Sequence, residues 1–309
     1  IVGSATGLHF NTVLNGKVAH CAGVAAVGIV PEARRSGAGF ALMEGANRQY
    51  LEEGFEFASL FPFRASYYRQ FGYEYAGTRH KLTVPERRLP KLEHELPVRP
   101  LDASDWLALE PCYTEFAQRY NGMNLRNELQ WRRALGMDKP FAVFVAGDPI
   151  EAYAMVRLDG GFWVSQEIRE LVWSTPRGYR SMLGFLKGLA QNKNELSWFE
   201  PVDSPFRTSY GERDVQIATD QWMMWRAIDV PRALEFLKTE TGSAEWSVRV
   251  VDKGLPENEG PWRVVVSAEG ATVEPTAKSD FTIPVGTLSQ LVLGDLGLGG
   301  AGLRVHRRA

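Results

Sequence analysis

Cysteine, histidine and excess charge of either sign are all scarce in this sequence. Of its 309 residues only Cys21 and Cys112 are cysteines, and they form no CxxC or zinc spacing, so a reduced, cytoplasmic setting is the simplest prediction. The five histidines form no HExxH or paired array, and we expect no metal site. The 35 basic and 37 acidic residues leave a net charge of −2, which argues against nucleic acid as a partner.

Long apolar runs are missing as well. The richest run, residues 22–30, is far shorter than the roughly 18 residues that span a bilayer, so we expect no membrane partner. Tryptophan is absent from residues 1–95, although the chain has nine. The first residue, Ile1, falls inside a predicted strand with no initiating Met and no signal peptide, and we expect further residues to precede it.

The length predicts two or three domains, and composition separates three blocks. The first block, residues 1–95, alternates strands with helices and has a turn at Asn15-Gly16, which predicts α/β layers around a mixed sheet. Its strands are expected at 5–14, 18–30, 55–63 and 75–84, and its helices at 37–53 and 66–71. Prolines at 85, 90, 97 and 100 mark a linker.

The other two blocks span residues 96–225 and 226–309. In the second block we expect a helix at 102–119, capped by Asp102 or Ser104, then strands at 141–145, 151–158 and 167–173 and a helix at 179–190. In the third we expect helices at 230–239 and 285–293 that flank strands at 246–251, 262–267, 271–274 and 280–284, followed by a glycine-rich tail. The fold class is α+β, and the second block could repeat the first block's architecture.

An anion site is predicted within "VGIVPEARRSGAGFALM", residues 27–43. Gly37 and Gly39 stand at a helix start, where backbone N–H groups and the helix dipole favour a negative charge. Arg34 and Arg35 add cations suited to phosphate oxygens, so a pyrophosphate fits. On these residues alone, a glycine-softened turn with solvated arginines remains an alternative.

Two familiar nucleotide motifs do not match this segment. A Walker A loop needs Gly-Lys-Ser/Thr, which residues 38–40 do not supply. A dinucleotide fingerprint wants a small residue at position 42, where Leu42 stands, and wants its glycines directly after the strand, whereas residues 31–36 intervene. A nicotinamide-dependent oxidoreductase is therefore a distant possibility.

The whole segment resembles the acetyl-CoA loop of the GNAT acyltransferase superfamily. The matching pattern is a Val-x-Ile strand, Pro31, Arg-x-x-Gly-x-Gly and an amphipathic helix. The resemblance implies that the strand pairs with the pantetheine arm of acetyl-CoA and that the loop holds its pyrophosphate. The residues it assigns to the cofactor are Val27, Gly28, Ile29, Arg34, Arg35, Ser36, Gly37, Ala38, Gly39, Phe40, Phe63 and Arg64.

A second motif of the same superfamily is Tyr-x-x-Phe-Gly-Tyr at 68–73, within "LFPFRASYYRQFGYEYAG". Phe71 and Tyr73 are expected in the aromatic core. Tyr68 occupies the position where the family places its general acid, and a phenol of pKa about 10 can protonate a departing thiolate if water is excluded. Tyr67 is expected to point about 100° away from it on a short helix.

The three-block layout narrows the resemblance to the enhanced-intracellular-survival (Eis-type) N-acetyltransferases. In that family the second block is a GNAT fold without a cofactor loop and the third resembles sterol carrier proteins. Here Pro176, Arg177 and Gly178 occupy the second loop position, but Arg180 replaces the second glycine, so we expect one acetyl-CoA site per chain. The family also implies tandem GNAT folds with mixed sheets and a hexamer.

The resemblance also implies a chain that ends in an aromatic residue after an acidic one, with the terminal carboxylate as general base. The Arg307-Arg308-Ala309 end does not match this pattern, so we assign no base. The resemblance implies an N-acetyltransferase acting on aminoglycosides, polyamines or lysine side chains. The alternative is a non-catalytic acyl-CoA sensor or scaffold whose C-terminal block binds a lipid or a partner protein.

Overall fold

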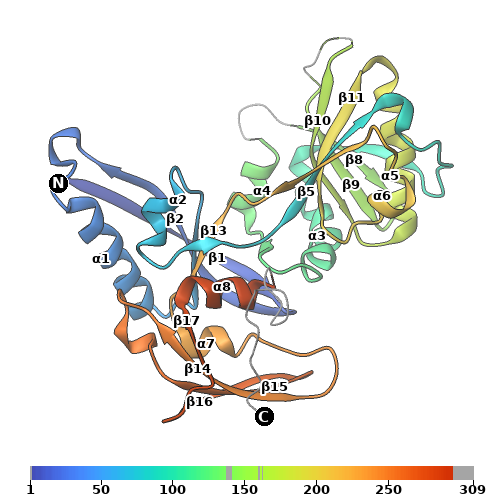
Figure 1. The fold of residues 1–309 in the computed structure, drawn as a ribbon. Helices are drawn as coiled ribbons and strands as arrows, with labels where there is room; N and C mark the ends of the chain where they lie inside the picture. The colour runs from blue at the N-terminus through green and yellow to red at the C-terminus, as the bar shows by residue number, and fades with distance from the viewer. Residues whose placement is uncertain (1, 137–140, 159–160, 162, 295–309) are drawn as a thin grey trace. The chain divides into compact units, whose positions relative to one another are not determined.

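The computed structural model describes residues 2–136, 141–158, 161 and 163–294 (Figure 1). The chain divides into two compact units. The first unit combines Ile1–Gly77, Tyr120–Leu125 and Gln221–Ala309, and the second combines Thr78–Arg119 and Arg126–Asp220. No helix of the described part is long and apolar enough to cross a membrane. The glycine-rich tail and its Arg307-Arg308-Ala309 end lie outside the described residues.

The first unit contains a mixed six-stranded sheet with the order β4-β13-β3-β2-β1-β7. The strands are β1 (Gly3–Leu14), β2 (Lys17–Ile29), β3 (Phe57–Leu60), β4 (Glu74–Tyr75), β7 (Asn124–Leu125) and β13 (Met224–Ala227). Asn15 and Gly16 have φ values of 50° and 79°, as a two-residue hairpin turn requires, and they join β1 to β2. β3 then runs parallel to β2, from the Cys21–Phe57 pair to the Val24–Leu60 pair.

Two helices lie on one face of this sheet. They are α1 (Ala38–Glu52), which packs on β1 and β2, and the short α2 (Ala65–Arg69). α1 buries Met43, Asn47 and Tyr50, whose spacing of four and three residues places them on one side of a helix. Met43 and Tyr50 join a hydrophobic core that also includes Tyr68 of α2.

The C-terminal part of the first unit is a four-stranded sheet with the order β16-β15-β14-β17. Its elements are α7 (Val230–Leu234), β14 (Ala244–Val251), β15 (Trp262–Ser267), β16 (Gly270–Pro275), β17 (Phe281–Pro284) and α8 (Val285–Leu293). α8 contacts both β13 and β17 (Figure 1). One hydrophobic core joins Cys21 and Phe57 of the six-stranded sheet to Val248 and Leu288, so the C-terminal part shares its interior with that sheet.

The second unit is built on a mixed seven-stranded sheet with the order β12-β5-β11-β10-β9-β8-β6. The strands are β5 (Arg79–Pro85), β6 (Val98–Leu101), β8 (Ala142–Ala146), β9 (Ala152–Val156), β10 (Ser165–Trp173), β11 (Glu195–Pro201) and β12 (Gln216–Asp220). The helices are α3 (Glu110–Ala117), α4 (Glu128–Ala134), α5 (Pro176–Leu189) and α6 (Pro205–Ser209). α5 packs across β8, β9 and β10.

Several expected elements are altered. The strand expected at 75–84 is two strands, and β5 pairs with β11 and β12 of the second unit rather than with the first sheet. In return β13 pairs with β3 and β4. β5 thus joins the second unit although it precedes residue 95, and β13 joins the first unit although it begins before residue 226. The division into domains at 1–95, 96–225 and 226–309 stays a prediction.

Two expected helices are shorter than their apolar patterns suggest. The one expected at 102–119 begins as a 3-10 segment that is not helical at Asp105, and α3 starts only at Glu110. Asp102 does cap that segment, because its carboxylate accepts a hydrogen bond from the Ser104 N–H at 2.8 Å. The helix expected at 230–239 ends at Leu234.

Candidate active site

The predicted anion loop lies between the end of β2 and the first turn of α1. Gly37 is the residue before α1 and has φ 88°, a left-handed conformation that favours glycine. A Cβ placed there would meet nothing within 4 Å, so the backbone is open on this side. Arg34 and Arg35 are exposed, and among the described residues neither has an ion-pair partner. The N–H groups of the first turn of α1 face the same end and lack acceptors within the helix, and that of Ala38 donates to the Ser36 hydroxyl oxygen at 3.4 Å.

Gly39 has a different reason for being glycine. A Cβ there would lie 2.9 Å from the Tyr67 hydroxyl oxygen, and that hydroxyl donates a hydrogen bond to the Gly39 carbonyl oxygen at 2.9 Å. The missing side chain therefore makes room for Tyr67 of α2, whereas the sequence suggested only that it opens the backbone to a ligand. This hydrogen bond ties the start of α1 to α2.

The edge of β2 beside the loop is unpaired. Parallel pairing with β3 ends at Val24 and Leu60, and beyond that point β2 has a described strand only on the β1 side. Ala26 has φ 50° and forms a bulge opposite β1, where the register shifts between Ser4 and Thr6. Backbone groups at residues 27–29 are thereby left open at the carboxyl end of β2. Their pairing with pantetheine stays a prediction.

Tyr68 lies on α2 at the same end of the sheet. Tyr68 is 3% exposed. Its ring centroid lies 5.4 Å from that of Phe63, 5.1 Å from that of Tyr67 and 6.2 Å from that of Tyr73. Burial raises the pKa of Tyr68, with a smaller contribution from Tyr67. The Tyr73 hydroxyl is held by Asn47 at 2.8 Å, whereas none of the described residues hydrogen-bonds the Tyr68 hydroxyl. The phenol is therefore protonated at neutral pH and free to donate.

The aromatic residues around Tyr68 separate into core and rim. Phe71 and Tyr73 are 3% and 1% exposed, which confirms their expected place in the core. Phe63 is 71% exposed, and Phe40 also faces solvent while its ring lies 5.1 Å from that of Phe71. Arg64 is the exposed residue that precedes α2.

An exposed aromatic pair was missed by the sequence analysis. Phe61 and Trp222 are 59% and 42% exposed, and their ring centroids lie 4.5 Å apart. They follow β3 and precede β13, which pair in antiparallel fashion from Leu60 and Met224. Only this pairing brings the two rings together, since 160 residues separate them in the sequence.

In the second unit, a carboxylate of the protein binds the segment that precedes α5, which corresponds to the anion loop before α1. The Glu151 carboxylate accepts hydrogen bonds from Arg177 Nε at 2.8 Å and from the hydroxyl of Thr175, which caps α5. A Cβ on Gly178 would lie 2.6 Å from the Glu151 carbonyl oxygen. Arg180 is paired with Glu95. An internal carboxylate thus sits where an anion would bind at the start of α5.

In the second unit, buried side chains lie where the central strands β10 and β11 stop pairing. Parallel pairing of β10 and β11 stops at Glu167 and Ser197. The buried Glu200 carboxylate beyond it accepts hydrogen bonds from the Tyr179 hydroxyl at 2.8 Å and from Trp198 Nε1 at 2.7 Å. Among the described residues, the space beside this end of β11 is thus occupied by buried side chains of the second unit.

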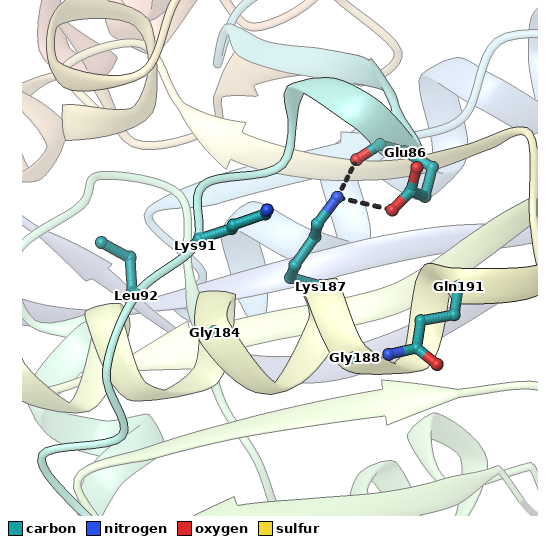
Figure 2. Close-up of a pocket in the computed structure, with 7 residues that line it drawn as sticks. All are labelled: Glu86, Lys91, Leu92, Gly184, Lys187, Gly188 and Gln191. Atoms are coloured by element: carbon teal, nitrogen blue, oxygen red, sulfur yellow. Dashed lines mark hydrogen bonds and ion pairs between the residues drawn. The ribbon is translucent and has the colours of Figure 1, made fainter.

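A hollow of about 490 Å³ lies beside α5 in the second unit (Figure 2). It is lined by Glu86, Lys91, Leu92, Gly184, Lys187, Gly188 and Gln191. Lys187 Nζ donates to the Glu86 carbonyl oxygen at 2.8 Å and pairs with its carboxylate, so this cation is already neutralised. We assign no ligand to this hollow.

Family models match three segments of the chain. Residues 1–76 match an acetyltransferase (GNAT) domain, residues 122–227 match a second acetyltransferase (GNAT) domain model, and residues 230–300 match a sterol carrier protein domain. The first match contains the loop and Tyr68, and the second contains the occupied loop around Arg177.

Whole-chain comparisons agree with these matches. The chain is 27% identical over 256 residues to the N-acetyltransferase Eis of Mycobacterium tuberculosis, a match that covers 76% of this chain and 62% of that relative. A GCN5-related N-acetyltransferase from Anabaena variabilis has the same fold, with TM-score 0.87 and 23% identity over 97% of this chain and 79% of that one. Eis1 from Mycobacterium abscessus superposes with TM-score 0.81 and 24% identity, covering 96% and 79% of the two chains. The chain therefore contains two GNAT acetyltransferase domains followed by a sterol carrier protein domain, and it is similar to the Eis N-acetyltransferases.

Proposed function

We propose that this chain forms an acetyl-CoA-dependent N-acetyltransferase that transfers the acetyl group directly to an amine, with Tyr68 as general acid. The observation that carries the proposal is the juxtaposition of an open anion loop and a free, buried phenol at the carboxyl ends of β2 and β3. The Tyr67–Gly39 hydrogen bond links the two features. In the described part of the second unit, Glu151 and Glu200 occupy the corresponding places and bind Arg177 and Tyr179.

The cofactor assignment follows the geometry of the loop. The first-turn N–H groups of α1 and the cations Arg34 and Arg35 suit the two phosphates of acetyl-CoA. The open edge at residues 27–29 suits the amide groups of the pantetheine arm, which can pair like an added strand. Together they would place the thioester near Tyr68. The GNAT superfamily's use of acetyl-CoA supports this assignment.

In the proposed reaction the amine nitrogen attacks the thioester carbonyl carbon. A C–N bond forms, the C–S bond breaks, and the departing thiolate takes the proton of the Tyr68 hydroxyl. The acceptor amine has a pKa near 10 and must lose a proton to a base, which we do not assign. Burial of Tyr68 keeps the phenol protonated, so that the proton is available when the thiolate forms.

The acceptor we propose is a cationic amine, such as an aminoglycoside, a polyamine or a lysine side chain. Exposed aromatic rings around the site, including Phe61, Phe63 and Trp222, suit an ammonium group through cation–π attraction. A cytoplasmic location and a hexameric assembly belong to the same proposal and rest on the family resemblance.

The test is a thiol-release assay with acetyl-CoA and the three amine classes. We expect release that depends on the amine and that yields the N-acetylated product by mass spectrometry. A non-catalytic acyl-CoA-binding protein would bind acetyl-CoA in calorimetry but release no thiol with any amine. That outcome would refute the enzymatic proposal while leaving the cofactor site in place.

A further inference from the structure

An arginine side chain is buried in the interior of the first unit. Arg226 of β13 is 1% exposed and pairs with Ala58 in the sheet. Its Nη2 donates to both carboxylate oxygens of Asp252 at 2.8 Å, and its Nη1 donates to the Phe71 carbonyl oxygen. Its Nε is buried with no hydrogen-bond partner among the described residues. A buried ion pair seldom stabilises a fold more than apolar side chains of similar volume, so stability alone does not explain this pair.

Asp252 holds the guanidinium in one orientation. Its carboxylate also accepts hydrogen bonds from the backbone N–H groups of Gly254 at 3.3 Å and Leu255 at 3.2 Å, and from Asn258 Nδ2 at 2.9 Å. The same Asn258 nitrogen donates to the Ile228 carbonyl oxygen at 2.9 Å. The anchor of Arg226 therefore belongs to the C-terminal part of the chain.

The other end of Arg226 touches the turn that carries Tyr68. The backbone N–H groups of Phe71 and Tyr73 both donate to the Tyr68 carbonyl oxygen, at 3.0 and 3.3 Å. Gly72, between them, has φ 82°, and a Cβ there would clash with Arg226 Nη1. Val285 Cγ1 would lie equally close to that Cβ, so the guanidinium and Val285 together leave room for glycine alone.

We infer that Arg226 is a positioning residue for Tyr68, fixing the direction of the phenol through the Phe71 carbonyl, and that Asp252 keeps Arg226 in place. The inference rests on the proposed role of Tyr68. The sterol-carrier-like part of the chain would then take part in acetyl transfer without touching the substrate. A misplacement of about 1 Å from outside the reacting groups can cost about 100-fold in rate.

The first measurement compares Arg226→Met with Arg232→Met. Arg232 of α7 is the control: its side chain is 46% exposed, but it too joins a backbone carbonyl, that of Gly54 at 2.8 Å, to a buried carboxylate, that of Glu56. Its partners do not belong to the Tyr68 turn. We expect Arg226→Met to lower kcat by about 10- to 100-fold with KM for acetyl-CoA within threefold, and Arg232→Met to leave both unchanged.

A double variant separates positioning from stability. Arg226→Met leaves the Asp252 carboxylate buried without its cation, so its Tm should fall. Adding Asp252→Asn removes that uncompensated charge and should restore much of the Tm. We expect kcat to stay low in the double variant. Recovery of kcat together with Tm would overturn the inference, and the double variant carries the test if the single one does not fold.

The Tyr68 ring can also be followed without activity. In protein labelled with 3-fluorotyrosine, the fluorine resonance that disappears in Tyr68→Phe belongs to Tyr68. We expect it to shift in Arg226→Met and in the double variant, but not in Arg232→Met. An unmoved resonance would refute the positioning role even if no amine were acetylated, whereas a moved resonance without thiol release would refute only the proposed function.

Discussion

The Tyr67 hydroxyl donates a hydrogen bond of 2.9 Å to the carbonyl oxygen of Gly39, so α2 is fastened to the start of α1. The neighbouring Tyr68 hydroxyl has no such hydrogen-bond partner among the described residues, so its proton is available for donation. Under the proposed function the two adjacent tyrosines therefore have different tasks: Tyr67 holds the start of α1 in place, and Tyr68 supplies the proton.

Replacing Tyr67 by Phe should weaken acetyl-CoA binding. The ring remains, but one hydrogen bond of about 0.5–1.5 kcal/mol is lost from the start of α1, which corresponds to roughly a 2- to 10-fold rise in KM. We expect kcat to change little, since Tyr67 does not face the thiolate in the proposed mechanism. Steady-state kinetics with varied acetyl-CoA measures both values, and a lowered kcat at constant KM would contradict this division of tasks.

Tyr68→Phe should have the opposite signature. The ring and its packing remain while the proton is removed, so kcat should fall by roughly 100- to 10,000-fold, as expected for loss of a general acid. Acetyl-CoA affinity in calorimetry should barely change, because the hydroxyl acts mainly as the thiolate develops. A variant within threefold of the wild-type kcat would show that another group is the acid.

Gly37→Asn tests the open side of the loop. Any side chain at φ 88° is strained, but asparagine adopts the left-handed region more readily than most residues, so the change adds a side chain beside the first turn of α1 at the smallest cost. We expect acetyl-CoA affinity to fall about 10-fold or more, about 1.4 kcal/mol, in calorimetry.

Gly242→Asn is the matched control for this change. Gly242 has φ 72° and also has nothing within 4 Å of a would-be Cβ, but it lies in a turn before β14. Its variant should lose similar stability and keep full acetyl-CoA affinity. Equal affinities of the two variants would remove the pyrophosphate from this loop.

The buried Glu200 predicts a pH dependence of stability in the second unit. Burial raises the pKa of Glu200 despite hydrogen bonds from Ser204, Trp198 and Tyr179. The folded chain therefore holds this proton at a higher pH than the unfolded chain does. Its contribution to the free energy of unfolding is fully present below the ordinary pKa of about 4.5 and is lost as pH rises through the folded pKa.

Glu200→Gln should remove this loss. Denaturant unfolding at a series of pH values should show the variant gaining stability relative to wild type as pH rises from 4 to 8. Glu167→Gln, on the exposed side of β10, serves as control and should follow the wild type. Parallel curves for wild type and Glu200→Gln would contradict the raised pKa.

Local patterns were sufficient for most of the first unit and for both signature motifs. Asn15-Gly16 indicates a tight turn, and the apolar spacing along α1 indicates one buried helix face. The strands expected at 5–14 and 18–30 agree with β1 and β2 within two residues. The segments around Gly37 and Tyr68 were recognisable because loop and turn chemistry depends on residues close together in the sequence.

Only the tertiary structure could decide the contacts between distant segments. β13 crosses into the first sheet and carries Arg226, whose partners Phe71 and Asp252 lie 155 and 26 positions away. A charged residue in "MMWRA" does not indicate a fully buried strand, since its burial depends on a carboxylate that the chain supplies elsewhere. The same holds for Gly39, where a side chain would collide with the hydroxyl of Tyr67, which lies 28 positions later in the sequence. Local sequence sets the preferred backbone conformation, but which side chains meet depends on how the whole chain closes its core.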